Sequence, residues 1–335
     1  MAERRETQVP AAAHGMRLDR WLHETYPQLA RATVQKWLRK GRVRIAGKRA
    51  KNSYRLQGGE AIVLPPEQPQ SDAAPPSLGD GARAEVRRWL IYKDDDMLAL
   101  NKPPGLAVQG GSKTRHHLDR LLDGLRFDAA ERPRLVHRLD KATSGVLLLA
   151  RHRAAAQEFT RAFAAQRMRK LYWGLVLGCP RPREGRIALA LRKTGRAAAG
   201  DRARMEPTPP DAAQARAAAT LYRVCAEIGD ALAFVAFLPL TGRTHQIRAH
   251  AAAQGWPLLG DDKYGRTAPP DLPAGLPAGL GDELGKGLHL HARALQLPGG
   301  GPCLTAELPP HMQKSWARLG LAPRGGEAWL KEPSA

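Results

Sequence analysis

The alternation of apolar and polar positions predicts a small mixed unit near the start of the chain. Apolar residues recur at the spacing of one helix face within residues 17–26 and again within residues 34–38, which indicates two short helices. Alternating positions at 43–45 and an apolar run at 60–64, each beside glycine-containing turns, predict a small sheet. We therefore expect one compact unit over residues 15–65.

A second and larger set of apolar segments follows from residue 89 onward. Apolar runs predict strands at 90–92, 97–100, 145–149, 171–177, 217–225 and 231–239. Helical spacing predicts helices at 154–166 and 244–254. Strands and helices come in mixed order, without the regular alternation of a doubly wound fold. We therefore expect an α+β domain with a largely antiparallel mixed sheet flanked by helices.

Composition divides the chain further. Residues 66–83 are rich in Pro, Ser, Ala, Gly and Asp and show no apolar period, so we interpret them as a linker. Residues 266–287 are rich in Pro, Gly and Leu, which is typical of a surface excursion. The predicted organisation is an N-terminal tail (1–14), the first unit (15–65), the linker (66–83), the larger domain (84–320) and a C-terminal tail (321–335).

The charge of the chain indicates a polyanionic partner. The 53 lysines and arginines exceed the 32 acidic residues and give a formal net charge of +21, which favours nucleic acid. An anionic membrane would satisfy the same charge, but the sequence has no basic amphipathic anchor and no apolar stretch near the about 20 residues that span a bilayer. The first residues lack the apolar stretch of a secretion signal, so we expect a cytoplasmic protein.

The positive charge is concentrated in the first unit. Residues 31–51 contain nine lysines and arginines and no acid, whereas a merely solvated helix face would mix the two signs. A solvated surface remains the alternative to nucleic-acid contact. The candidate RNA-binding residues in this segment are Lys36, Arg39, Lys40 and Arg42.

Several kinds of cofactor chemistry are disfavoured. No glycine-rich stretch has the spacing of a dinucleotide fingerprint or a phosphate loop. The three cysteines are far apart, and the histidine pairs 116–117 and 289/291 lack a carboxylate at zinc-protease spacing. We therefore expect neither a metal site nor a nucleotide cofactor.

Asp140 is a candidate catalytic acid. It lies among cations, just before the apolar run at 145–149, so a rigid strand could hold its carboxylate in a cleft. An Asp before Thr, Ser and Gly also commonly caps a turn through its own backbone. Spacing alone favours neither the catalytic nor the turn-capping interpretation.

Two further segments contain candidate partners for this acid. Thr244 could cap a helix on which His245 and Arg248 share a face, and Arg248 could then pair with Asp140 and keep it ionised. Contact with phosphates only is the alternative for these residues, namely Arg243, His245, Arg248 and His250. Tyr172, within a basic stretch at the start of a strand, could stack on a base or pack in the core.

Taken together, these segments resemble one known family. The stretches Asn101-Lys-Pro-x-Gly105, His137-Arg-Leu-Asp-x-x-Thr-Ser-Gly145, Lys170-x-Tyr172 and Gly242-Arg-Thr-His-Gln-Ile-Arg-x-His250 resemble the signatures of the RluA/RluC/RluD family of pseudouridine synthases. Residues 15–65 are similar to an S4 (αL-type) RNA-binding domain. This order of domains looks most like the RluC and RluD branches, which modify uridines in large-subunit ribosomal RNA.

The resemblance implies roles for individual residues. Asp140 would be the catalytic aspartate, acting as a nucleophile at C1′ or as a base at C2′ of the target uridine. Tyr172 would stack on the base, and Arg248 would be the ion-pair partner of Asp140. Further RNA contacts are expected from Arg138, Lys141, Arg243 and His245.

The resemblance also implies the partners. No cofactor is needed, and the substrate would be 23S ribosomal RNA or a pre-50S particle, bound by a monomer without any membrane. A synthase that acts on transfer RNA, or a non-catalytic RNA-binding assembly factor with the same fold, is the alternative. Retention of both Asp140 and Tyr172 favours the enzyme.

Overall fold

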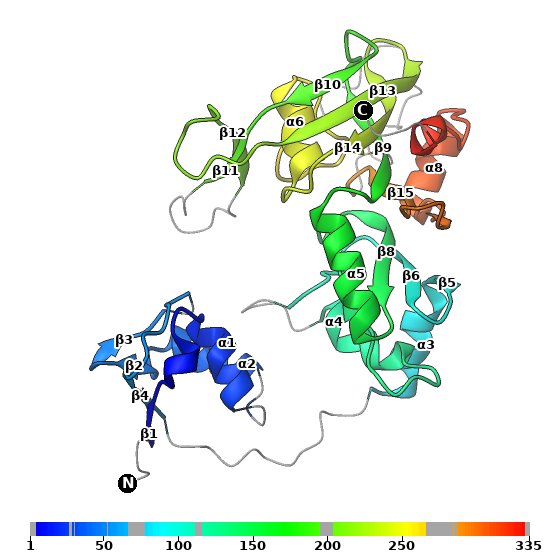
Figure 1. Ribbon diagram of the computed structural model, residues 1–335. Coiled ribbons are helices and arrows are strands. Elements are labelled where there is room, and N and C mark those ends of the chain that lie inside the picture. The colour runs from blue at the N-terminus through cyan, green and yellow to red at the C-terminus, as the bar shows by residue number, and fades with distance from the viewer. Residues whose placement is uncertain are drawn as a thin grey trace. The chain divides into compact units, whose positions relative to one another are not determined.

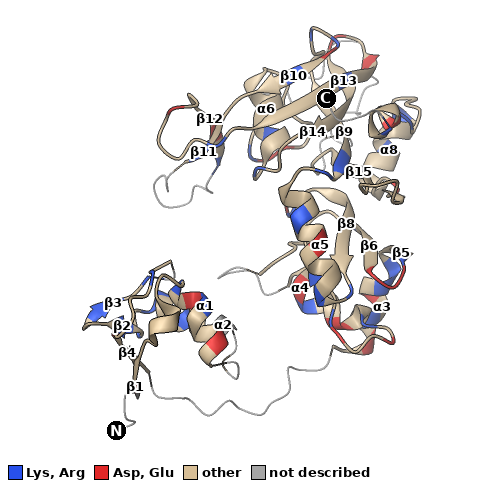
Figure 2. Ribbon diagram, in the orientation of Figure 1, with Lys and Arg blue, Asp and Glu red and all other residues tan. Residues whose placement is uncertain are grey.

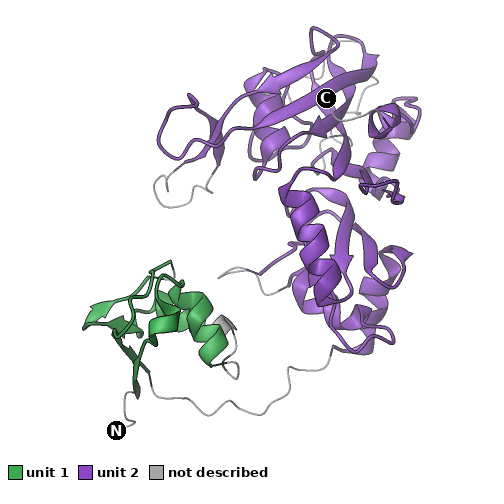
Figure 3. Cartoon of the chain, in the orientation of Figure 1, with its two compact units in different colours: residues 1–77 green, residues 78–335 purple. Residues whose placement is uncertain are grey.

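The chain forms two compact units, residues 1–77 and 78–335 (Figures 1 and 3). The computed structural model describes residues 5–26, 29, 31–51, 53–65, 78–110, 116–194, 204–265, 284 and 287–331. Each unit encloses its own core. Within the described residues, no helix is long and apolar enough to cross a bilayer.

The first unit packs two helices against a four-stranded sheet. Its helices are α1 (Leu18–Thr25), α2 (Arg31–Arg39) and the short η1 (Ala11–Ala13), and its strands are β1 (Arg5–Gln8), β2 (Arg44–Ile45), β3 (Lys48–Arg49) and β4 (Ala61–Leu64). The sheet order is β1-β4-β2-β3. Leu18, Leu22 and Val34 are fully buried, which confirms that the predicted helical spacing marks a core-facing stripe.

The predicted N-terminal tail is wrong. β1 pairs in register with β4, from Arg5 opposite Leu64 to Gln8 opposite Ala61. Val9 and Ala13 are buried in the same core. The sequence gives little sign of this strand because Arg-Glu-Thr-Gln is polar and joins the sheet through its backbone.

The second unit is built on a ten-stranded mixed sheet. Its strands are β5 (Leu90–Lys93), β6 (Met97–Lys102), β7 (Arg134–Leu135), β8 (Ser144–Ala150), β9 (Arg169–Leu177), β10 (Glu184–Ala188), β13 (Ala219–Ile228), β14 (Leu232–Pro239), β15 (Leu290–Gln296) and β16 (Cys303–Thr305). The order is β10-β13-β14-β9-β15-β8-β6-β5, with β7 paired to β8 and β16 to β15. β11 (Leu191–Lys193) and β12 (Met205–Pro207) form a separate pair.

One pair in the large sheet is parallel, β8 with β15, and the others are antiparallel. The helices are α3 (Asp80–Arg88), α4 (Leu118–Leu121), η2 (Leu122–Leu125), α5 (Arg153–Ala164), α6 (Gln246–Ala253), α8 (Pro310–Arg318) and η3 (Glu327–Leu330). The predicted α+β class with a largely antiparallel mixed sheet flanked by helices is confirmed (Figure 1). Each predicted strand and helix is present, with ends shifted by a few residues.

β8 lies in the middle of this core, and all of its residues are buried. Leu147 and Leu149 pack on the side of α3 and η2, whereas Val146 and Leu148 pack on the side of α5. Because both faces are covered, the strand reads as a continuous apolar run rather than an alternating one. The segment that ends in Asp140 therefore leads into one of the most constrained strands of the sheet.

Two other boundary predictions need correction. The predicted linker 66–83 overlaps α3, which begins at Asp80 and buries Val86 fully; residues 66–77 lie outside the described part. The predicted C-terminal tail contains η3, whose Trp329 is buried against the second unit. The Trp173 indole donates to the Gly325 carbonyl at 2.7 Å, so this segment belongs to the domain.

The predicted surface excursion 266–287 lies mostly outside the described residues. Within it, the structure describes Leu284, which is buried at 1 % exposure in the core, and Gly287. Leu284 therefore corrects the expectation that this whole segment lies on the surface.

A buried histidine ties the parallel pair together. His291 of β15 accepts a hydrogen bond at Nδ1 from the Ser144 hydroxyl (2.9 Å) and donates from Nε2 to the Ala306 carbonyl (3.1 Å). Burial lowers the pKa of His291 from 6.5 to about 4, so the imidazole is neutral. Between these two pKa values, His291 therefore binds a proton in the unfolded chain but not in the folded chain.

We predict that acid destabilises the second unit through this histidine. As the pH falls from 6.5 towards 4, His291 protonates only in the unfolded chain, which lowers the free energy of unfolding by at most about 1.4 kcal/mol per pH unit. Urea unfolding between pH 7 and pH 5 should show a shallower pH slope for His291→Gln than for the wild type. If the free energy of unfolding depends on pH equally in the two proteins, this account is contradicted, even where the variant is less stable at every pH.

Candidate active site

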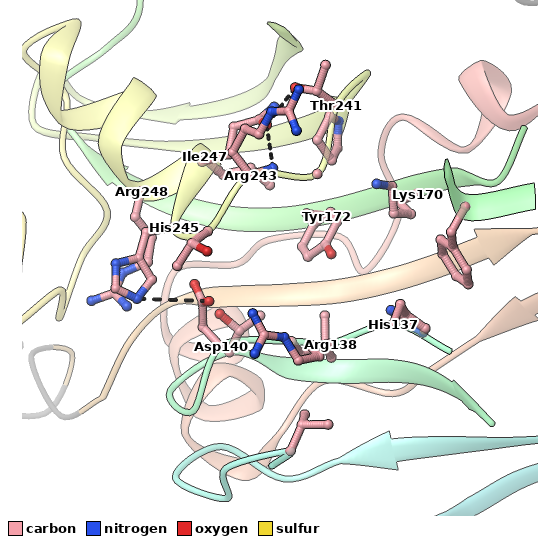
Figure 4. Close-up of a pocket in the computed structure, with 18 of the residues that line it drawn as sticks. His137, Arg138, Asp140, Lys170, Tyr172, Thr241, Arg243, His245, Ile247 and Arg248 are labelled. Carbon is pink, nitrogen blue, oxygen red and sulfur yellow. Dashed lines mark hydrogen bonds and ion pairs between the residues drawn. The ribbon is translucent and has the colours of Figure 1, made fainter. Parts of the chain in front are cut away.

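A cavity of about 750 Å³ opens beside β8 and β9 (Figure 4). Its walls come from four parts of the second unit: residues 107–109, residues 136–143 before β8, the end of α5 with the start of β9, and residues 239–248 around the start of α6. Seven of the predicted site residues line it, namely Arg138, Asp140, Lys141, Tyr172, Arg243, His245 and Arg248.

The backbone that carries Asp140 is fixed by its neighbours. The Thr143 amide donates to the Asp140 carbonyl at 3.2 Å, which closes a turn just before β8. Gly145 has φ +111°, and a Cβ there would lie 2.2 Å from the Ala292 carbonyl oxygen of β15. Only glycine fits at this position, so the close approach of β8 and β15 sets where the turn ends.

The carboxylate of Asp140 does not cap that turn. It accepts no hydrogen bond within the described part of the chain, and its side chain is 24 % exposed to the cavity. The nearest side-chain nitrogen of a Lys, Arg or His residue is Nε2 of His245, 3.9 Å from Oδ1, and burial lowers the pKa of that imidazole. The turn-capping interpretation is therefore wrong, and the group faces the space where a ligand would bind.

The predicted ion pair between Arg248 and Asp140 is also wrong. Arg248 instead forms a two-pronged pair with Asp261: Nε to Oδ2 is 2.8 Å and Nη2 to Oδ1 is 2.6 Å. Both side chains are almost fully buried, at 4 % and 0 % exposure. Such a planar pair satisfies both groups, so Arg248 acts on Asp140 by its field rather than by contact.

Asp261 is ionised in spite of its burial. Burial opposes its charge, but the Arg248 hydrogen bonds and the backbone amides of Lys263 and Tyr264 together hold its pKa below the ordinary value. This carboxylate is fully occupied by donors. It is therefore a structural anchor for Arg248 rather than a free acid.

His245 has the contact with Asp140 that was expected of Arg248. It lies just before α6 in the left-handed region, φ +51°, so the predicted cap at Thr244 is replaced by His245, without a side-chain cap bond. Its Nδ1 is 2.9 Å from the Tyr264 hydroxyl, which already accepts the Met205 amide at 2.8 Å. The hydroxyl hydrogen is thus free for Nδ1, which places the His245 Nε2 hydrogen on the side of Asp140.

Tyr172 projects from β9 into the cavity between Asp140 and Lys170 (Figure 4). Its ring also packs against core residues on either side, so it is both a cavity wall and a core residue. Burial and the nearby Asp140 raise its pKa, which keeps the phenol protonated. Its flat face is suited to stacking.

Lys102 is a site residue that the sequence reasoning did not single out. Its ammonium is fully buried and donates to the carbonyls of Pro103 (2.8 Å), Leu106 (2.9 Å) and Lys141 (3.3 Å). Burial lowers its pKa to about 7, and the charge of Asp140 opposes that shift. The sequence did contain the stretch Asn101-Lys-Pro-x-Gly, and its lysine could have been predicted to have a structural role.

The remaining predicted RNA contacts are cations that are exposed or, for Arg243, half-buried. Arg138 reaches across to Gln109, with 3.4 Å between Nη1 and Oε1, and Arg243 donates from Nε to the Ala217 carbonyl. Lys36, Arg39, Lys40 and Arg42 are exposed on the first unit, where Figure 2 shows Lys and Arg along β2 and β3. Within the described residues, no group of three His, Cys, Asp or Glu side chains is arranged to hold a metal ion.

Comparisons with known proteins decide the family. A family model described as RNA pseudouridylate synthase matches residues 96–253, and an S4 domain model matches residues 16–62. A protein of Rickettsia conorii named "Ribosomal large subunit pseudouridine synthase C" is 35 % identical over 255 residues, which cover 74 % of this chain and 82 % of that protein. This chain belongs to the RNA pseudouridylate synthase family.

Other relatives agree with this assignment. The Vibrio cholerae protein of the same name is 34 % identical over 264 residues, which cover 75 % of this chain and 77 % of the relative. An Arabidopsis thaliana protein named "RNA pseudouridine synthase 4, mitochondrial" is 33 % identical and covers 83 % of this chain and 70 % of its own length. The solved structure "Human RNA Pseudouridylate Synthase Domain Containing 4" superposes with a TM-score of 0.61 at 30 % identity, covering 72 % of this chain and 97 % of that one.

We predict that the Arg248–Asp261 pair holds this synthase domain together. Asp261→Asn leaves a buried guanidinium without its counter-charge and should lower the free energy of unfolding by about 3–5 kcal/mol. Asp262→Asn is the matched control, since the Asp262 carboxylate is 70 % exposed and lies 3.5 Å from the same guanidinium; it should cost less than about 1 kcal/mol. Urea unfolding of both variants checks this, and equal losses would contradict the anchoring role of Asp261.

Proposed function

We propose that this protein isomerises uridines of large-subunit ribosomal RNA to pseudouridine, with Asp140 as the reacting carboxylate. The observation that carries the proposal is one acid without a hydrogen bond, in a cavity whose other charged side chains are lysines and arginines and whose remaining lining is polar and apolar. The printed names of the bacterial relatives supply the RNA class. A net charge of +21 supports a polyanionic substrate.

The proposed reaction exchanges one glycosidic bond for another. The bond from uracil N1 to ribose C1′ breaks, the uracil turns within the cavity, and a bond from C5 to C1′ forms. The C5 hydrogen leaves as a proton and N1 takes up a proton. Asp140 serves either as the nucleophile at C1′ or as the base at C2′. Substrate and product are isomers, so no redox partner or second substrate takes part.

The distribution of acids favours isomerisation over hydrolysis. A glycosidase uses two carboxyl groups on either side of the bond that it cleaves. Among the described residues that line the cavity, Asp140 alone has a carboxylate. Asp261, the neighbouring acid, is tied to Arg248 and two amides. The site therefore lacks a free second acid for a hydrolytic water.

The other side chains of the cavity have supporting roles in this proposal. Tyr172 stacks on the uracil, which must first leave its helix or loop at a cost of a few kcal/mol. Arg138, Lys141, Arg243 and His245 contact the displaced RNA strand, and Arg248 supports Asp140 through its field. We propose a monomer as the acting form. A 23S RNA or pre-50S substrate supports the cytoplasm as the proposed location.

We predict that Asp140→Asn abolishes the modification without unfolding the protein. Asp128→Asn, at an exposed acid outside the cavity, is the matched control and should behave as the wild type. Transcribed large-subunit ribosomal RNA and transfer RNA are incubated with each protein, and pseudouridine is mapped by carbodiimide modification. Identical pseudouridine maps for the wild type and Asp140→Asn on every RNA would refute the proposal that the protein is an enzyme. Modification of transfer RNA alone would refute the ribosomal substrate.

The first unit is proposed to add phosphate contacts. Lys36, Lys40 and Arg42 surround a hollow of about 140 Å³ together with Thr33 and Trp37. Their side chains have the positive charge and exposure that backbone phosphates require.

We predict that the triple variant Lys36→Gln, Lys40→Gln and Arg42→Gln binds ribosomal RNA more weakly and with less dependence on salt. Each phosphate contact that is lost should reduce the slope of log affinity against log salt by about 0.7–0.9. The control is Arg17→Gln with Arg20→Gln, because these two guanidinium groups are already paired with Asp19 and Glu24. A triple variant with the wild-type slope would show that this face does not contact RNA.

A further inference from the structure

One end of the cavity contains a cation that the proposed chemistry does not use. Lys170 precedes Tyr172 by two residues on β9, so both side chains point to the same face of the strand. The Lys170 ammonium has no hydrogen bond and no ion pair within the described part of the chain. In Figure 4, it lies on the side of Tyr172 away from His245.

This ammonium differs from the other cations of the site by its surroundings. Burial lowers the pKa of Lys170 to about 8, whereas Arg138 and Lys141 are exposed to water. Keeping a charge in such a place costs free energy unless an anion compensates for it. The same burial makes a hydrogen bond to an anion stronger here than at the surface.

His137 supplies a second donor at the same end. Its Nε2 accepts the Leu148 amide at 2.8 Å, so in the neutral ring the hydrogen is on Nδ1. Burial and the charge of Lys170 lower its pKa to about 3, which keeps the ring neutral. The ring is stacked on Phe163, with 4.4 Å between the ring centroids, so its direction is fixed. The Nδ1 hydrogen has no acceptor among the described residues.

This end of the cavity is open to solvent. Ala164 and Gln166, at the end of α5, line it and are exposed. Lys170 lies two residues, about 7 Å, along β9 from the ring of Tyr172. An RNA strand whose base stacks on Tyr172 therefore passes its backbone close to this ammonium.

We propose that Lys170 and the Nδ1 hydrogen of His137 form a subsite for a backbone phosphate of the RNA, at a linkage beside the reacting nucleotide. The inference rests on the proposed function for the position of the nucleotide. The phosphate supplies the anion that Lys170 lacks and the acceptor that His137 lacks. The subsite fixes the strand on one side of Tyr172 while Asp140 acts on the other.

The test measures RNA binding in the Asp140→Asn protein, so that no turnover occurs. Lys170→Gln removes the ammonium, and Arg169→Gln is the matched control, because it removes a charge from the next residue, on the opposite face of β9. The probe is the ribosomal RNA fragment that the wild type modifies or, should it modify none, the fragment that it binds most tightly. The affinity is measured over a range of salt concentrations.

The proposal predicts that Lys170→Gln weakens binding at least about tenfold and reduces the salt slope by about 0.7, the value for one contact to a single strand. Arg169→Gln should change the affinity less than threefold. The melting temperature of Lys170→Gln should equal or exceed that of its parent, because an uncompensated buried charge is removed. A lower melting temperature with an unchanged salt slope would overturn the proposal, since that result describes a structural lysine.

A second arm locates the phosphate. Neutral methylphosphonate replaces each of the two linkages that flank the target uridine, one at a time. At one of these linkages, the replacement should weaken binding to the Lys170-containing protein as much as Lys170→Gln does, and combining both changes should add no further loss. Losses that multiply at both linkages would overturn the proposal. Because all readouts are of binding, they separate this result from a failure of the proposed reaction.

Discussion

The buried ammonium of Lys102 connects the two loops on which the site depends. It donates to Pro103 and Leu106 in its own loop and to Lys141, the residue after Asp140. The Gly105 amide joins the same Lys141 carbonyl at 2.8 Å. A charge in this position is costly unless each of its hydrogens has an acceptor, so the three carbonyls must stay where they are. The loop that presents Asp140 is thereby tied to the end of β6 instead of lying free over the cavity.

The rest of the site follows from how charge is distributed around this point. Asp261 is saturated by Arg248 and two amides, whereas Asp140 is left open. The charges of Lys102 and Arg248 act on Asp140 without a hydrogen bond or an ion pair to it. A carboxylate that accepts no hydrogen bond from the protein can react with a ligand without first breaking a protein contact.

The sequence predicted the parts of the fold that are recorded in local pattern. β8 and β14 are buried on both faces and appear as continuous apolar runs, and the turn before β8 placed Asp140 correctly at a strand entrance. β15 was not predicted, although Leu-His-Ala-Arg-Ala alternates apolar and polar residues, because two of its apolar positions are alanines and its polar His291 is itself buried. Its histidine and arginine are accommodated by Ser144 and by the Ala306 carbonyl, which only the tertiary structure supplies. The strand β1 and the segment around Trp329 were also not predicted, because their partners are likewise supplied only by the tertiary structure.

The chemistry was predictable to a similar degree. The sequence indicated that an arginine, a histidine and an acid would gather around one cavity, and the structure brings them together. It did not indicate which acid would pair with Arg248, because Asp261 lies 13 residues further along and reaches the guanidinium through a loop. His245 thus took the place beside Asp140. Pairing of this kind depends on the fold of two separate segments, and neither segment encodes it alone.

The most direct test of the account is the fate of the hydrogen at C5 of uridine. Large-subunit ribosomal RNA is transcribed with tritium at that carbon and incubated with the wild type or with Asp140→Asn. The account predicts one tritium released to water for each pseudouridine formed by the wild type, no free uracil, and no release by the variant. Free uracil without pseudouridine, or equal tritium release by both proteins, would contradict it.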